Sequence, residues 1–387
     1  METKVGIVGL GKLGLPLAVV MAKKYDVVGI DLDHRTVDMI NDGESPYDEP
    51  DLQDRLIRFP IKASTEYSDL ADREIIFTIL PTPSQENGKF SNKYLEQALQ
   101  QIGKHCLECR LVSIVSTVMP GSCERFREML PNNIDLCYNP TFIALGRVIR
   151  DLEEPDILLI GEDNPMTGEL LENTWGEVII DPGKIRRTTY MNAEISKIAL
   201  NSFVTMKINF ANNLGEVCEN LGGDCDAITN IIGRDRRVGH AFLKSGMPFG
   251  GPCFPRDNRA YSTLFNRDVI HSEVDRENDG HIIRIVDRCN KILTYLKGRR
   301  INLVGLGYKP DTKYTFDSPS RWLADSLDRA GVTCFLYEDD VKVVPEADLT
   351  ILCLPTNAEI KGKKVLDCWR CRPDLNNQDK EYYALGK

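Results

Sequence analysis

The stretch Gly9-Leu10-Gly11-Lys12-Leu13-Gly14 decides the fold of the N-terminal part of the chain. It follows the apolar run Val5–Val8, which is typical of a buried parallel strand, and precedes Leu15–Lys24, whose pattern predicts a helix. Glycines between a strand and a helix let the backbone approach a pyrophosphate, which then lies at the helix N-terminus. The stretch therefore predicts a dinucleotide-binding fold. The alternative is a structural glycine turn.

The acidic residue after the next strand indicates which dinucleotide binds. The run Val27–Ile30 ends at Asp31, where a carboxylate can accept hydrogen bonds from the adenine ribose and repel a 2′-phosphate, which favours NAD over NADP. Two later runs, Ile75–Leu80 and Leu111–Val115, end beside further polar residues at the edge along which dinucleotides lie. The expected NAD contacts are Gly9, Gly11, Lys12, Leu13, Gly14, Asp31, Thr82, Pro83, Ser116 and Thr117, with Arg256 added from a later loop.

Strand-like runs alternate with amphipathic runs over the first half of the chain, which predicts a doubly wound α/β sheet. Helical spacing from Met191 to Leu221 predicts one long helix, and Ile301–Val304 restarts an α/β pattern. We therefore expect a Rossmann-like domain (1–190), a helical central region (191–297) and a smaller C-terminal α/β domain (298–387). The polar end, Asn376–Lys387, is expected to be a loosely held tail.

Composition excludes several classes of protein. The net charge of −10 argues against binding to nucleic acid or anionic membranes. No apolar run approaches the roughly 20 residues that span a bilayer, and no signal peptide is visible, so the cytoplasm is expected. The 12 cysteines lie in apolar stretches and are interpreted as reduced thiols. The Cys-x-x-Cys pairs Cys106/Cys109 and Cys368/Cys371 are far apart in sequence, so we expect no metal.

The segment Phe249–Asp257 holds one cysteine, Cys253, between two glycines and two prolines. Such a loop is rigid and brings backbone close to a ligand. Lys197 and Asn201 are four residues apart and share one face of the long helix, so together they could stabilise an oxyanion or fix a water. Taken singly, these residues are more simply an inert thiol, a solvated lysine and a surface amide. The combination favours a reactive thiol.

Together these motifs resemble the UDP-glucose/GDP-mannose 6-dehydrogenase family, and most of all its UDP-glucose 6-dehydrogenase type. The resemblance runs from Val5 to about Asp367. Its most specific parts are the glycine loop, Thr82-Pro83, Ser116-Thr117-Val118, Asn139-Pro140, Glu194 to Asn201, Arg237-Val238-Gly239, Phe242-Leu243-Lys244, the Cys253 loop and Gly305 to Thr312.

The resemblance implies oxidation of a nucleotide sugar, a UDP- or GDP-hexose with UDP-glucose as the default, at C6 by two hydride transfers to NAD without metal. Cys253 would trap the aldehyde as a thiohemiacetal that becomes a thioester, and Lys197 would stabilise negative charge on the sugar oxygen. Asp257 and Asn201 would place water or relay protons, near Thr117. The implied substrate contacts are Thr141, Phe142, Lys197, Asn201, Arg237, Phe242, Lys244, Phe249, Gly250 and Lys309.

The resemblance also implies that Arg237 reaches the substrate of a neighbouring subunit, so a homodimer or higher even oligomer is expected, built by the central region. The C-terminal domain would bind the nucleotide sugar. Three positions depart from the family: Thr141 and Leu145 stand where relatives have Glu, and Phe316 where they have an Arg at the NAD phosphates. Because Thr141 cannot take a proton at neutral pH, thioester hydrolysis is expected to depend on Asp257 and a water.

Two other functions stay open from the sequence. One is a two-electron β-hydroxyacid dehydrogenase, which shares the glycine loop and helical middle but needs no cysteine. The other is a slow or non-catalytic paralogue that binds NAD or a nucleotide sugar, a reading motivated by Thr141 and Phe316.

Overall fold

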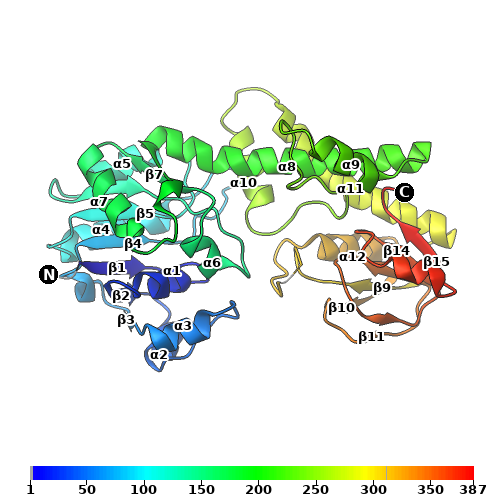
Figure 1. Cartoon of the computed structure of the whole chain (residues 1–387), viewed down its shortest axis with the longest axis horizontal. Helices are drawn as coiled ribbons and strands as arrows, with labels where there is room; N and C mark the ends of the chain where they lie inside the picture. Colours follow the sequence, from blue (N-terminus) through cyan, green and yellow to red (C-terminus); the bar gives the residue numbers. More distant parts are fainter. Residues whose placement is uncertain (1–2, 311) are drawn as a thin grey trace. The chain divides into compact units, whose positions relative to one another are not determined.

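The computed structural model describes residues 3–310 and 312–387, and these form two compact units that meet in sequence at Ile198 and Ala199 (Figure 1). Unit 1 is built on one large sheet and unit 2 on a smaller one. The predicted α/β fold class, with a long central helix, is confirmed. The finer division into three domains stays a prediction.

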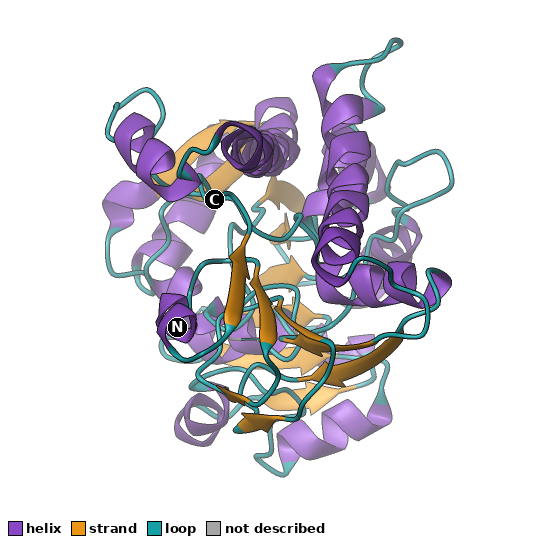
Figure 2. Ribbon diagram, turned by 90° about the vertical axis from the view of Figure 1, so that its right-hand side faces the viewer, coloured by secondary structure: helices purple, strands orange, loops and turns teal. Residues whose placement is uncertain are grey.

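The sheet of unit 1 runs in the order β3-β2-β1-β4-β5-β6-β7-β8, and every neighbouring pair is parallel except β6 and β7. Figure 2 shows the strands of the protein in orange and its helices in purple. Buried apolar side chains form two clusters, one with Ile7 and Leu15, the other with Ile76 and Leu99, so helices cover both faces. The strands are β1 (Lys4–Val8), β2 (Asp26–Ile30), β3 (Lys62–Ser64), β4 (Ile75–Thr78), β5 (Leu111–Ile114), β6 (Asp135–Tyr138), β7 (Leu158–Glu162) and β8 (Ile185–Thr189).

The helices of unit 1 connect these strands. They are α1 (Gly14–Met21), α2 (His34–Asn41), α3 (Leu52–Arg58), α4 (Lys93–His105), α5 (Ser122–Met129), α6 (Val148–Glu153) and α7 (Pro165–Gly176), with short 3₁₀ turns η1 (Tyr67–Leu70) and η2 (Pro182–Lys184). The long helix α8 (Tyr190–Leu221) starts in unit 1 and matches the predicted helix within one residue. The predicted strands Val5–Val8 and Val27–Ile30 are confirmed as β1 and β2.

Unit 2 holds a second parallel sheet in the order β10-β9-β12-β14-β15, beside the short parallel pair β11 and β13. Its strands are β9 (Arg300–Val304), β10 (Thr333–Tyr337), β11 (Val343–Val344), β12 (Leu349–Leu352), β13 (Glu359–Ile360), β14 (Lys364–Asp367) and β15 (Glu381–Ala384). Its helices are α9 (Cys225–Gly233), α10 (Phe254–Ser262), α11 (Ile270–Leu293) and α12 (Pro319–Arg329), with the 3₁₀ turn η3 (Pro373–Asn377).

The expectation of a loosely held C-terminal tail is wrong. Strand β15 pairs with β14 along Glu381–Ala384, and Leu385 is buried. The Gly386 N–H donates to the Glu219 carboxylate at 2.7 Å, and its carbonyl accepts from the Cys225 N–H at 3.0 Å. The end of the chain is therefore an edge strand tied to helices α8 and α9. Within the described residues, no helix is long and apolar enough to span a membrane.

Candidate active site

The glycine loop between β1 and α1 requires glycine at two positions and leaves space at the third. Gly9 has a φ of +95°, and a Cβ there would lie 2.2 Å from the Ile79 carbonyl oxygen. A Cβ at Gly14 would lie 1.7 Å from the Gly9 oxygen, whereas a Cβ at Gly11 would meet nothing within 4 Å. Fold packing thus accounts for Gly9 and Gly14. The open side of Gly11 fits the close approach of a pyrophosphate to the start of α1.

Asp31 joins the end of β2 to this loop. Its Oδ2 accepts a hydrogen bond from the Leu10 N–H at 2.8 Å, and its Oδ1 accepts one from the Asp33 N–H at 3.0 Å. Each carboxylate oxygen has a second lone pair, so Asp31 retains acceptors for ribose hydroxyls. This geometry suits the ribose role predicted for it.

Predicted cofactor residues at the ends of β4 and β5 lie together. The Ser116 hydroxyl donates to the Leu80 carbonyl and accepts from the Leu80 N–H, both at 2.8 Å. The Thr82 hydroxyl donates to the Thr117 carbonyl, also at 2.8 Å. These bonds hold the two strand ends in fixed register beside the glycine loop, at the edge where a dinucleotide would lie.

Lys197, on α8, is held by the segment that follows β6. Its side chain is buried, and its Nζ donates to the Thr141 carbonyl at 2.6 Å and lies 4.9 Å from the centroid of the Phe142 ring. A backbone oxygen and an aromatic face both favour a cation. The structure therefore brings the predicted residues Thr141, Phe142 and Lys197 into contact within unit 1.

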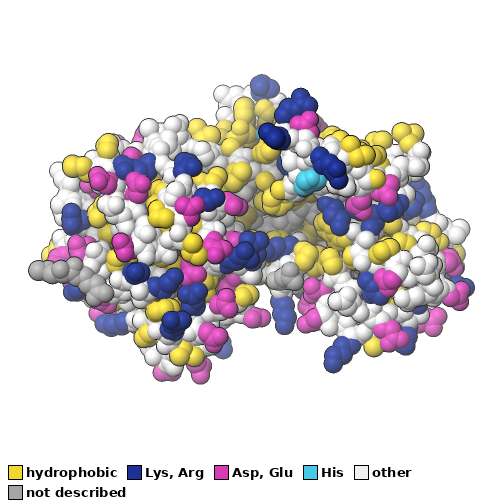
Figure 3. All heavy atoms as spheres, viewed as in Figure 1, with side chains coloured by type: hydrophobic (Ala, Val, Ile, Leu, Met, Phe, Trp, Pro, Cys, Tyr) yellow, Lys and Arg dark blue, Asp and Glu magenta, His cyan; other side chains and the backbone are white. Residues whose placement is uncertain are grey.

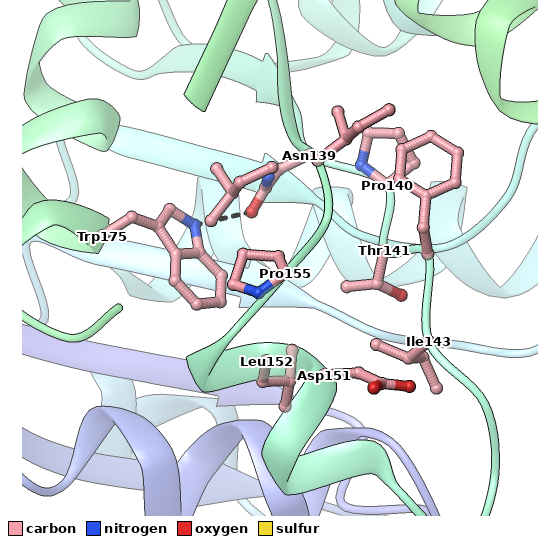
Figure 4. A pocket seen from close by; sticks show the side chains of 11 residues that line it. Asn139, Pro140, Thr141, Ile143, Asp151, Leu152, Pro155 and Trp175 are labelled. Carbon is pink, nitrogen blue, oxygen red and sulfur yellow. Dashed lines mark hydrogen bonds between the residues drawn. The ribbon is translucent and has the colours of Figure 1, made fainter. Parts of the chain in front are cut away.

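A small pocket lies beside Thr141 (Figure 4). Asn139, which fixes one wall, accepts a hydrogen bond from the Trp175 indole N–H at 2.8 Å and donates to the Leu159 carbonyl. The carboxylate in the lining is Asp151, which accepts from the Ala144 N–H at 3.0 Å and from the Arg147 guanidinium at 2.9 Å. Both carboxylate oxygens of Asp151 therefore have a hydrogen-bond partner within unit 1.

Cys253 differs from the other thiols of the chain. All twelve cysteines lie in the described part of the chain, and Cys253 alone is exposed. Burial raises the pKa of Cys106, Cys109 and Cys353 to about 12. Burial likewise raises the pKa of Cys371, the most accessible member of the two Cys-x-x-Cys pairs, to about 11. The buried thiols are therefore poor nucleophiles. Across residues 3–310 and 312–387, no group of three or more potential ligands could hold a metal.

The residues predicted to work with Cys253 in unit 2 lie next to it. Cys253 is the N-cap of α10, and the Asp257 N–H donates to its carbonyl at 2.8 Å. The Asp257 side chain is buried, and its Oδ2 accepts from the Asn201 amide at 2.6 Å. Its Oδ1 accepts from the Arg256 guanidinium at 3.3 Å. The residue with the exposed thiol and the residue with the buried, hydrogen-bonded carboxylate are thus one helical turn apart along the chain.

The glycines before Cys253 are required by close packing. The Phe249 backbone is held on both sides by Asn278 of α11, through two hydrogen bonds of 2.9 Å. The Gly251 N–H donates to the Asp317 carbonyl at 2.8 Å, and a Cβ at Gly250 would lie 2.3 Å from that same oxygen. The Cys253 loop is therefore fixed against the segment between β9 and α12.

The remaining predicted substrate residues of unit 2 are more exposed. Arg237 pairs with Asp235 at 2.7 Å and is otherwise open to solvent. Phe242 adopts a φ of 58°, and its ring meets that of Phe254 edge to face at 6.1 Å. Lys244 is exposed, and the Lys309 ammonium lies 5.9 Å from the centroid of the Tyr308 ring. Their roles stay predictions.

Sequence reasoning missed Tyr314. Burial, followed by the charges of Cys253 and Asp317, raises the pKa of Tyr314, which places its phenol close to the reactive loop. The available signal was the aromatic residues at 308, 314 and 316, of which the sequence analysis had weighed only Phe316.

Comparisons with known proteins identify the family. Residues 3–179 match the UDP-glucose/GDP-mannose dehydrogenase family, NAD binding domain, and residues 191–277 match the central domain of that family. The UDP-glucose 6-dehydrogenase YwqF of Bacillus subtilis is 30% identical over 338 residues, covering 83% of this chain and 76% of the relative. The chain belongs to the UDP-glucose/GDP-mannose dehydrogenase family. It is therefore an NAD-dependent enzyme of the nucleotide-sugar dehydrogenase family, and the predicted NAD cofactor is confirmed.

Other relatives and solved structures agree on the fold. The UDP-glucose 6-dehydrogenase AglM of Haloferax volcanii is 29% identical, over 87% of this chain and 83% of that protein. A UDP-glucose dehydrogenase from Pyrobaculum islandicum superposes with a TM-score of 0.91 at 24% identity, over 100% of this chain and 98% of that one. The UDP-N-acetyl-mannosamine dehydrogenase Cap5O from S. aureus gives 0.82 at 22% identity, over 99% and 98%. The first two of these proteins are named for UDP-glucose and the third for UDP-N-acetyl-mannosamine.

Proposed function

We propose that this chain oxidises a nucleotide sugar, with UDP-glucose as the first candidate, at C6 to the uronic acid in two two-electron steps. The observation behind the proposal is the exposed Cys253 thiol at the start of α10, one helical turn from the buried Asp257 that Asn201 binds. A dehydrogenase that stops at the aldehyde needs no such thiol, so this arrangement favours full oxidation to the acid.

The chemistry divides between the cofactor and the protein. Held by the glycine loop and Asp31, NAD would supply a hydride acceptor for each of the two oxidations. Between these steps the Cys253 sulfur adds to the aldehyde carbon, and the carbonyl electron pair becomes an alkoxide that is protonated to a thiohemiacetal. Loss of the second hydride from the carbon, together with the hydroxyl proton, leaves a thioester. Water then adds to its carbonyl carbon, the C–S bond breaks, and the thiol and the carboxylate are released.

The side chains around Cys253 and on α8 support these steps. Cys253, at the N-terminus of α10, is the exposed thiol that would add to the aldehyde. Lys197 would stabilise negative charge on the sugar oxygen, since its buried ammonium is already oriented by the Thr141 carbonyl. Asp257, held by Asn201 and Arg256, would accept a proton from the attacking water.

The test is the number of NADH molecules formed per nucleotide sugar consumed, measured over a panel of UDP- and GDP-hexoses. Two equivalents are expected for the true substrate, and Cys253→Ala is expected to abolish the second. The matched control is Cys334→Ala, because Cys334 is a partly buried thiol on β10 and should leave the yield at two. One equivalent in the wild type, or normal yield in Cys253→Ala, would contradict the proposal.

A second candidate is a protein that binds NAD or the nucleotide sugar but turns over slowly or not at all. The observation in its favour is that position 141, whose carbonyl binds Lys197, carries a threonine, whose side chain cannot exchange a proton at neutral pH. Binding of a nucleotide sugar without NADH formation from any member of the panel would favour it.

A further inference from the structure

Helix α8 holds the loop between β5 and α5 through one fully buried carboxylate. Glu194, near the start of α8, has no exposed surface. Its Oε2 accepts a hydrogen bond from the Gly121 N–H at 2.6 Å, and its Oε1 accepts one from the Cys123 N–H at 2.7 Å. Gly121 has a φ of +85°, so the chain turns there before α5 begins. Both oxygens of one carboxylate therefore fix the far end of this loop.

The near end of the same loop is fixed by the residues that follow β4. The Ser116 hydroxyl makes two hydrogen bonds with the Leu80 backbone, and the Thr82 hydroxyl donates to the Thr117 carbonyl. The loop that carries Thr117 is thus tied at one end to the neighbouring strand end and at the other end to Glu194 of α8.

A second residue of α8 holds the next strand end along the sheet. Lys197 follows Glu194 by three residues, so the two side chains leave the same face of the helix. The Lys197 ammonium donates to the Thr141 carbonyl, in the segment after β6, at 2.6 Å. Since β5 and β6 are neighbours in the sheet, one turn of α8 ties together the segments that follow two adjacent strands.

The order of the strands indicates which half of the cofactor would meet the Thr117 loop. Asp31, at the end of β2, suits the adenine ribose, and Gly11, after β1, suits the pyrophosphate. The sheet continues from β1 to β4 and β5. A dinucleotide that lies along this edge would therefore bring its nicotinamide half to the ends of β4 and β5, where Thr117 lies.

We propose that Glu194 is a positioning residue for hydride transfer. It keeps the Thr117 loop, which would meet the nicotinamide, in fixed register with Lys197, which would meet the sugar oxygen. The part of Lys197 rests on the proposed function, whereas the tie between Glu194 and the loop does not. Glutamine at position 194 keeps one acceptor oxygen but turns an amide N–H group toward the second backbone N–H, so the loop would lose one of its two anchors.

The first test measures the bound cofactor without any substrate. The nicotinamide ring of NADH fluoresces, and its fluorescence lifetime lengthens when the ring is held rigidly. In Glu194→Gln we expect a shorter lifetime in the saturated NADH complex with an unchanged Kd, because the glycine loop and Asp31 still bind the other half. The control is Leu99→Ala, which opens a cavity in the core cluster that also contains Cys123 and should change neither value.

The second test measures NADH formation from the panel of nucleotide sugars. Glu194→Gln should lower kcat by roughly a hundredfold, the cost of misplacing reacting groups by about 1 Å, with the KM for NAD unchanged. In Thr117→Ala the contact that Glu194 positions is already lost, so adding Glu194→Gln should lower kcat much less than it does in the wild type. Leu99→Ala should keep the kcat of the wild type.

The outcomes distinguish this inference from the proposed function. An unchanged lifetime in Glu194→Gln, an equal shortening in Leu99→Ala, or a wild type that leaves NADH with its free lifetime would overturn the positioning role. So would an equal loss of kcat with and without Thr117. If the lifetime shortens as expected but the wild type forms no NADH from any nucleotide sugar, Glu194 still positions the nicotinamide and the oxidation proposed for Cys253 is wrong.

Stability is controlled separately. Circular dichroism selects a temperature at which the variants are folded. If Glu194→Gln does not fold, Glu194→Asp takes its place, because aspartate keeps the charge on a side chain too short to reach both N–H groups, and the same shortening of the lifetime is expected.

Discussion

At the scale of single residues, Thr141 is the departure from the family that bears most directly on the proposed reaction. Its carbonyl orients the Lys197 ammonium, but its side chain cannot exchange a proton at neutral pH. We predict that Thr141→Glu speeds hydrolysis of the thioester by about a hundredfold, the lower end of the range for an added general base. Single-turnover quenching measures it, with Thr141→Gln as the control of equal size. Equal rates in the two variants would remove position 141 from the hydrolytic step.

Asp31 is the second residue whose role can be tested alone. Both of its oxygens accept backbone hydrogen bonds, yet they keep lone pairs for the ribose. We predict that Asp31→Asn lowers kcat/KM for NAD by about tenfold, the effect of losing one charged hydrogen bond. It should also reduce the preference for NAD over NADP, because the 2′-phosphate of NADP is no longer repelled. The measurement is kcat/KM with each cofactor. An unchanged ratio of the two values would argue against this role.

At the scale of elements, local signals predicted well and long-range pairings did not. The strand, glycine loop and helix around Gly9 could be read from the sequence because their geometry is fixed by adjacent residues. Strand β8 was missed because Ile185–Thr189 is polar and half-exposed, and β15 because Glu381–Ala384 is short and lies in the polar run expected to be a tail. Tyr314 was missed for another reason, since only folding brings it to Cys253.

The contact between α8 and α5 is an element-scale feature with a measurable contribution. The fully buried Glu194 carboxylate accepts from the Gly121 and Cys123 N–H groups, at 2.6 and 2.7 Å, at the start of α5. Charged hydrogen bonds to a helix N-terminus are strong, so Glu194→Gln should lower the free energy of unfolding by roughly 2–3 kcal/mol in urea titrations. The matched control is Glu49→Gln, whose half-exposed carboxylate caps α6 in the same way and should cost less. If both variants lost the same free energy of unfolding, burial would not be what strengthens the Glu194 contact.

At the scale of the whole molecule, α8 presents an apolar stripe that we propose pairs with a second copy of the chain. Phe203, Phe210 and Val217 recur every seven residues and are 58%, 53% and 49% exposed, and hydrophobic side chains reach the surface over the end of this helix (Figure 3). Burying such a stripe favours association around a two-fold axis. Phe210→Glu should therefore shift the mass seen by light scattering from two chains to one. It should also reduce turnover, because the family resemblance implies that Arg237 reaches the substrate of a neighbouring subunit. Ile57→Glu, at an apolar residue on α3 that is 66% exposed, should leave the mass unchanged. A wild type that is monomeric at micromolar concentration would show that the stripe has another role.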